Sequence, residues 1–162
     1  MIPVLVLVFY SPYEGKFFLS SLLFALAAAT DWLDGYLARK LNQQTPFGAF
    51  LDPVADKLMV AAALVVLVEQ YATWWFSIPA IIIVGREIVI SALREWMAEL
   101  GKRTSVAVSY IGKVKTTVQM MSVTVLLAAG EAGYPLLRML GIGMLYVAAV
   151  LTIWSMTIYL RA

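Results

Sequence analysis

The chain has 162 residues, of which 62% are hydrophobic and 14% are charged, and its formal net charge is +2. Soluble globular domains are about 45–50% apolar and 25% charged, so this composition indicates a membrane protein. A spanning helix needs about 20 residues, and the length therefore allows roughly five or six spans in one domain, 1–162. The small charge, carried by dispersed bases, argues against nucleic-acid binding. Cysteine and histidine are both absent, which excludes disulfides, thiol nucleophiles and Cys/His zinc sites.

Apolar runs separated by turn residues predict an all-α bundle of about six transmembrane helices. The run 2–10 is about half a span long and ends at Ser11-Pro12, so we expect it to be the remaining half of a truncated first helix. Thr45 and Pro46 predict a helix start, and Gly101 predicts a helix end. The segment 71–76, YATWWF, is typical of an interfacial aromatic belt. The expected further helices cover the ranges 17–41, 45–69, 78–100, 106–129 and 136–160.

Four aspartates form two rows within a short stretch of the chain. Asp31 and Asp34 are three residues apart and share one helix face, and Gly48, Asp52 and Asp56 follow one another at intervals of four. If the two helices are neighbours, the four carboxylates converge and repel one another unless a cation binds between them. Hard oxygen donors suit magnesium, manganese or calcium. The alternative is a purely structural role, in which these aspartates form interfacial salt bridges with nearby bases, Arg39, Lys40 and Lys57.

This stretch resembles the signature of a known family. The pattern DxxDGxxAR(x8)GxxxDxxxD of the CDP-alcohol phosphatidyltransferases matches at every position, by Asp31, Asp34, Gly35, Ala38, Arg39, Gly48, Asp52 and Asp56. The segments 86–103 and 105–116 look further like the members of this family that make phosphatidylglycerophosphate. Members of the family usually begin with a further basic and polar stretch, which does not precede the run 2–10 here.

The resemblance implies a reaction and a role for each motif residue. It implies two divalent cations, Mg²⁺ or Mn²⁺, that bridge the aspartates and the diphosphate of CDP-diacylglycerol, while an alcohol displaces CMP. By position, Asp31, Asp34, Asp52 and Asp56 are the metal ligands, and Asp56 is also the general base. The CDP-diacylglycerol-binding residues are Asp31, Gly35, Ala38, Arg39 and Gly48. Gly35 and Ala38 either open a slot for the nucleotide or only let two helices pack closely.

Four bases follow the motif and suggest where the acceptor alcohol binds. Arg86 follows the apolar run IPAIIIVG and is therefore expected to lie deep within a span. Burying an arginine there is costly, so such a residue usually has a functional role. We expect a basic pocket for the phosphate of glycerol 3-phosphate, made by Arg86, Arg94, Lys113 and Lys115. The alternative for Arg86 is a pairing with a motif aspartate. Lys113 and Lys115 are two positions apart and cannot both face one spot on a helix. Glu87, Glu95 and Glu99 are interpreted as partners of neighbouring bases.

Most of the bases lie towards one side of the expected bundle, and only Lys16 and Arg138 lie towards the other. The positive-inside rule makes the basic side cytoplasmic, so the active site of this multi-pass protein is expected to face the cytoplasm. The resemblance to bacterial members of the family implies the bacterial inner membrane. The expected partners are CDP-diacylglycerol, glycerol 3-phosphate and membrane lipids. The chain is either a monomer or a homodimer.

The function expected first is the metal-dependent transfer of a phosphatidyl group from CDP-diacylglycerol to glycerol 3-phosphate. One alternative is cardiolipin synthesis, in which phosphatidylglycerol is the acceptor. A second alternative, from another class, is a divalent-cation transporter, because acidic residues on facing spans also describe an ion path. The crowding of all four aspartates towards one leaflet weakens the transporter hypothesis.

Overall fold

The protein is an all-α bundle of six helices in the part of the chain that the structure describes. The computed structural model describes residues 1–41, 46–99, 110–130 and 134–161, and within these ranges the side chains at 38–39, 46–47, 49–53, 94, 98, 110–113 and 158–161 lie outside the description. The helices are α1 (Ile2–Phe9), α2 (Lys16–Lys40), α3 (Pro46–Tyr71), α4 (Trp74–Glu99), α5 (Tyr110–Ala129) and α6 (Pro135–Arg161). All six expected helices are therefore present, which confirms the predicted fold class.

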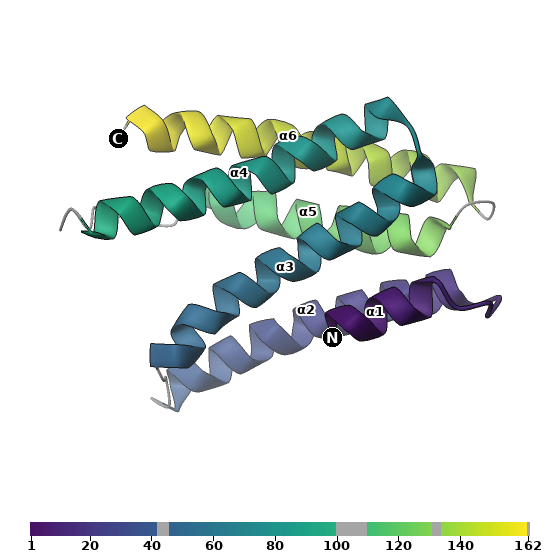
Figure 1. Cartoon of the computed structure of the whole chain (residues 1–162), viewed down its shortest axis with the longest axis horizontal. Coiled ribbons are helices and arrows are strands. Elements are labelled where there is room, and N and C mark those ends of the chain that lie inside the picture. Colours follow the sequence, from purple (N-terminus) through teal and green to yellow (C-terminus); the bar gives the residue numbers. More distant parts are fainter. Residues whose placement is uncertain (42–45, 100–109, 131–133, 162) are drawn as a thin grey trace.

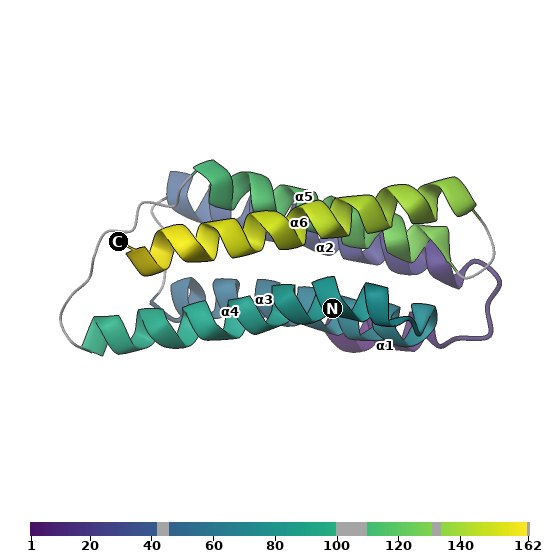
Figure 2. The same cartoon turned by 90° about the horizontal axis from the view of Figure 1, so that it is seen from above.

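The helices form two layers that pack face to face. Seen from above, α1, α3 and α4 lie in one layer, and α2, α5 and α6 lie in the other (Figure 2). Large side chains fill the space between the layers, with less than 2% of their surface exposed, among them Phe24, Leu64, Leu67, Phe76, Leu126 and Leu145. Burying these side chains contributes roughly 1.5–3 kcal/mol each relative to leaving them in water, but between lipid-exposed helices this gain is smaller because lipid is also apolar.

A close approach of α6 to α5 depends on a glycine. A Cβ added at Gly141 would lie 2.7 Å from Cγ of Leu126. The hydroxyl of Ser122 donates a hydrogen bond of 2.7 Å to the carbonyl oxygen of Gly141. Small residues and hydroxyl bonds of this kind hold helices together inside a membrane, where water exclusion gives little driving force.

The start of α4 differs from the prediction. The aromatic segment 71–76 was expected to lie before a helix that begins near residue 78, but α4 begins at Trp74. Pro79 lies inside this helix and has no N–H to give to the carbonyl of Trp75, four residues earlier. The hydroxyl of Tyr146 on α6 donates to that carbonyl at 2.6 Å instead. The helix therefore tolerates the proline because a neighbouring helix supplies the missing donor.

Three helices are long and apolar enough to cross a membrane among the described residues. These spans are Lys16–Leu37, Trp74–Met97 and Pro135–Thr157, and Val114–Ala129 is a shorter apolar helix. Many large apolar side chains on them face outward, such as Phe18 (69% exposed) and Ile81 (68% exposed). Such an apolar surface is stable in contact with lipid, so the chain is a multi-pass membrane protein.

One end of the bundle collects the helix ends that border the predicted site. The C-terminal ends of α2, α4 and α6 lie there together with the starts of α3 and α5, at the left of Figure 1. The ends of α1, α3 and α5 and the starts of α2, α4 and α6 lie at the opposite end. The helices thus run up and down through the bundle in the order from which the cytoplasmic side was predicted.

Candidate active site

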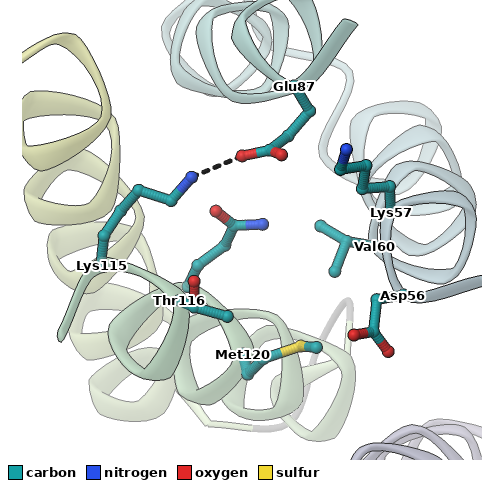
Figure 3. Close-up of a pocket in the computed structure, with 8 residues that line it drawn as sticks. Asp56, Lys57, Val60, Glu87, Lys115, Thr116 and Met120 are labelled. Atoms are coloured by element: carbon teal, nitrogen blue, oxygen red, sulfur yellow. Dashed lines mark hydrogen bonds and ion pairs between the residues drawn. The ribbon is translucent and has the colours of Figure 1, made fainter. Parts of the chain in front are cut away.

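A cavity of about 160 Å³ lies between α3, α4 and α5. Figure 3 shows Asp56, Lys57 and Val60 on one wall, Glu87 on the second, and Lys115, Thr116 and Met120 on the third. Gln119 completes the lining. Drug-sized ligands occupy pockets of about 300–1,000 Å³, so this volume suits a small polar molecule rather than a diacylglycerol.

Helix periodicity explains why these side chains share the cavity. Asp56 and Val60 are four residues apart on α3, and Lys115 and Gln119 are four residues apart on α5. Residues at this spacing lie one above the other on the same helix face. The general base predicted from the motif and one of the predicted phosphate-binding lysines therefore line one cavity.

Glu87 is the centre of an ion-pair cluster beside this cavity. Its carboxylate pairs with the ammonium group of Lys115, whose side chain is 5% exposed, and Figure 3 draws this contact. The guanidinium of Arg86 donates to the same carboxylate oxygen at 3.1 Å. Arg86 also donates a hydrogen bond of 3.1 Å to the hydroxyl of Ser155 on α6. The expectation that Glu87 pairs with neighbouring bases is confirmed.

The cluster carries more positive than negative charge. Lys57 also lines the cavity, and its ammonium group binds the hydroxyl of Ser91, which is a neutral partner. Three bases, Lys57, Arg86 and Lys115, thus surround one glutamate. The Nε of Arg86 is buried, and no described residue accepts a hydrogen bond from it. With the carboxylate of Asp56 in the same cavity, three bases face two carboxylates, which leaves one positive charge. This charge and the unused donor of Arg86 favour a phosphorylated ligand.

The observed partners of Arg86 differ from both partners that the sequence had suggested for it. Its contacts are with Glu87 and Ser155, whereas the two expectations were an acceptor phosphate or a motif aspartate. A guanidinium has five donors, so these contacts leave donors for a phosphate. The role of Arg86 in acceptor binding stays a prediction.

The acidic motif is described only in part. Asp31 and Asp34 are exposed near the C-terminal end of α2, Gly35 is half-buried one turn beyond Asp31, and Gly48 and Asp56 are half-buried on α3. Among the described side chains, no three acidic groups lie close enough to hold a metal ion. Several predicted site residues have side chains outside the described part, namely Ala38, Arg39, Asp52, Arg94 and Lys113.

The chemistry of the donors nevertheless fits the metals that the motif implies. Carboxylate oxygens on two helices are the ligands that Mg²⁺ and Mn²⁺ prefer. Asp31 and Asp34 lie at the same end of the bundle as the start of α3, which carries Asp52 and Asp56 (Figure 1). The convergence of all four carboxylates stays a prediction.

The sequence interpretation did not assign three of the cavity residues to the site. Lys57 was considered only as a salt-bridge partner for an aspartate, Glu87 only as a partner for bases, and Gln119 was not singled out. A signal for two of them was present, because Lys57 follows Asp56 directly and Gln119 lies one helical turn after Lys115. Glu87 offered no comparable signal, since the other cavity residues around it come from α3 and α5.

Comparisons with known proteins agree with the motif. The family model described as "CDP-alcohol phosphatidyltransferase" matches residues 1–154. Curated proteins from Pectobacterium atrosepticum, Salmonella choleraesuis and Escherichia coli K12 are each 57% identical over 162 residues, which is 100% of this chain and 87% of theirs. All three are named CDP-diacylglycerol--glycerol-3-phosphate 3-phosphatidyltransferase. Since the family model covers nearly the whole chain and the relatives match it from end to end, the chain belongs to the CDP-alcohol phosphatidyltransferase family.

Proposed function

We propose that this protein transfers the phosphatidyl group of CDP-diacylglycerol to sn-glycerol 3-phosphate, which yields phosphatidylglycerophosphate and CMP. The observation that carries this proposal is the 57% identity along the whole chain to relatives whose names state this reaction. The cavity beside Asp56 supports the choice of acceptor. Lys57, Lys115 and the adjacent Arg86 outnumber Asp56 and Glu87 by one positive charge, which suits glycerol 3-phosphate better than a neutral or zwitterionic alcohol.

The reaction needs one proton transfer and one displacement at phosphorus. The attacking hydroxyl oxygen forms a bond to the phosphorus that carries the diacylglycerol, and the bond from that phosphorus to the CMP phosphate oxygen breaks. We assign Asp56 as the general base that takes the proton of the attacking hydroxyl, because it lines the cavity in which the acceptor would bind. The Glu87 cluster holds Lys115 and Arg86 in place, so that the acceptor enters a charged site that is already ordered.

Divalent metal completes the site in this proposal. Asp31, Asp34, Asp52 and Asp56 would hold Mg²⁺ or Mn²⁺. Bound metal would neutralise the negative charge on the phosphoryl oxygens.

The nucleotide side of the site is expected near the end of α2 and the start of α3. We propose that Gly35, Ala38, Arg39 and Gly48 bind the nucleotide diphosphate, since small residues let a ligand approach the backbone. Gly35→Leu should therefore leave a folded protein that no longer binds CDP-diacylglycerol. Binding of the nucleotide lipid to purified protein in detergent checks this expectation, with Gly143→Leu on α6 as the control, because a Cβ there meets no atom within 4 Å. Unchanged affinity in the Gly35 variant would make this position a packing site only.

The bases of the cavity should affect the binding of glycerol 3-phosphate and not that of CDP-diacylglycerol. Lys115→Ala removes one charge from a phosphate clamp, and a lost charge-assisted hydrogen bond of about 1.5–3 kcal/mol raises KM for glycerol 3-phosphate roughly ten- to a hundredfold. The KM for CDP-diacylglycerol should stay nearly unchanged. Arg138→Ala, at the opposite end of the bundle, is the matched control and should change neither value. A uniform rise of both KM values in the Lys115 variant would remove this residue from the acceptor pocket.

We place the enzyme in the bacterial inner membrane with its site facing the cytoplasm. This proposal is supported by the bases at the end of the bundle where α2 ends and α3 begins. A homodimer stays a prediction, and the mass of the purified protein in detergent checks it.

A panel of acceptors tests the proposed function. Purified protein with CDP-diacylglycerol and metal should release CMP with glycerol 3-phosphate, and should release little with inositol phosphate, serine or phosphatidylglycerol. CMP release with phosphatidylglycerol instead would favour cardiolipin synthesis. Metal uptake into vesicles without CMP release under any condition would favour a transporter.

A further inference from the structure

Gln119 places an unused hydrogen-bond acceptor at the cavity between α3, α4 and α5. Its side chain lines the cavity, and the residue is only 5% exposed. Its carbonyl oxygen Oε1 is buried, and no described residue donates a hydrogen bond to it. A buried carbonyl without a donor is costly, and such a group in a folded protein calls for an explanation.

Charged and neutral polar side chains line the same cavity and suit different groups of a ligand. Lys57, Lys115 and Glu87 are charged and suit a phosphate, as described above. Gln119 is neutral, and its amide carries both donors and an acceptor. The oxygen that lacks a partner, Oε1, accepts from O–H or N–H groups and does not bind a phosphate dianion. Asp56 lines the same cavity and is assigned to the hydroxyl that reacts. A ligand that satisfies all three features has a phosphate, a reacting hydroxyl and a second hydrogen-bond donor.

We propose that Gln119 determines the specificity for the acceptor by accepting a hydrogen bond from the hydroxyl group that does not react. This inference rests on the proposed function, because glycerol 3-phosphate has one hydroxyl to attack phosphorus and a second on its central carbon. A site built to bind a hydroxyl rejects an analogue that lacks it, because the buried carbonyl is then left without a donor. Gln119 would thus exclude phosphorylated alcohols with a single hydroxyl.

The alternative is that Gln119 only fills space or binds a water molecule. Buried polar groups that lack a protein partner are often satisfied by ordered water. In that case Gln119 would affect stability and would not distinguish between acceptors. The two explanations therefore differ in one measurable quantity, the ratio of kcat/KM for two acceptors that differ by one hydroxyl.

The test compares glycerol 3-phosphate with 3-hydroxypropyl phosphate, which lacks the central hydroxyl. For the unchanged protein we expect kcat/KM to be about ten- to a hundredfold lower with the deoxy acceptor. For Gln119→Leu we expect the ratio to fall to within about threefold of one, chiefly through loss of activity towards glycerol 3-phosphate. The KM for CDP-diacylglycerol should stay nearly the same in both proteins.

Gln70→Leu is the matched control. Gln70 also has a buried side chain whose polar atoms lack a described partner, but it lies fourteen positions after Asp56, about 21 Å farther along α3. This variant should keep the acceptor ratio of the unchanged protein. If Gln119→Leu does not fold, Gln119→Met and thermal unfolding in detergent separate a loss of stability from a change in the ratio.

The outcomes separate this inference from the proposed function. Turnover of glycerol 3-phosphate with an equal rate for the deoxy acceptor would overturn the role of Gln119 and leave the proposed function standing. A tenfold or larger ratio that persists in Gln119→Leu would do the same. Absence of any turnover with glycerol 3-phosphate, together with turnover of another alcohol, would overturn the proposed function itself.

Discussion

Asp56→Asn should lower kcat by about 10²–10⁴, while the affinity for CDP-diacylglycerol falls much less. General-base catalysis contributes to the transition state, and an asparagine cannot take a proton from the attacking hydroxyl. The cavity places this residue beside the bases that we assign to the acceptor, so its loss should not disturb the nucleotide side in the same measure. Single-turnover rates with saturating glycerol 3-phosphate, measured beside equilibrium binding of CDP-diacylglycerol, check this expectation.

The control for this variant is Glu95→Gln, which removes one negative charge from an exposed position on α4 and should keep full activity. If Asp56→Asn loses binding and turnover to the same extent, Asp56 is chiefly a metal ligand, and the base must be sought elsewhere. Activity close to that of the unchanged protein would remove Asp56 from the chemical step.

The second large effect concerns metal. Removing divalent cations with a chelator should lower turnover by about a thousandfold or more, because charge stabilisation of several kcal/mol is lost and each 1.4 kcal/mol corresponds to a factor of ten. Readdition of Mg²⁺ or Mn²⁺ should restore the rate, and Asp52→Asn should be inactive at any metal concentration. Substantial turnover in excess chelator would contradict the metal-dependent mechanism.

A readout other than activity separates metal binding from catalysis. Binding of Mn²⁺ to the purified protein can be followed by electron paramagnetic resonance with no substrate present. We expect Asp31→Asn, Asp34→Asn and Asp52→Asn each to weaken this binding, and Glu95→Gln to leave it unchanged. Equal Mn²⁺ binding in all four variants would show that the motif aspartates do not hold the metal.

The helices could be predicted from the sequence because their signals are local. Runs of about twenty apolar residues, Pro46 at a helix start and glycine-containing turns fix most boundaries to within a few residues. The start of α4 was misplaced because Pro79 and the preceding aromatic residues look like a connection. What makes the helix continue through Pro79 is the hydroxyl of Tyr146 on α6, a contact that no local pattern reveals.

The site could be predicted only as far as the motif extends. Asp56 was assigned from its place in the motif of the family that the chain resembles, and it lines the cavity between α3, α4 and α5. Its role as general base stays a prediction. Gln119 lies one helical turn after Lys115, but neither it nor Glu87 was assigned to the site, because the cavity that they line is made by three different helices. A glutamate beside an arginine resembles a surface ion pair in sequence, and a glutamine in an apolar span resembles a packing residue.

The central claim is that the phosphate-bearing acceptor becomes part of the lipid while CMP leaves. Purified protein should be incubated with CDP-diacylglycerol, metal and glycerol 3-phosphate whose phosphate carries a radioactive label. We predict that the label enters a lipid that still contains this phosphate, in a one-to-one ratio with released CMP, and that Asp56→Asn forms both products about 10²–10⁴ times more slowly. Release of CMP without label in the lipid, or label that appears as inorganic phosphate, would contradict the account.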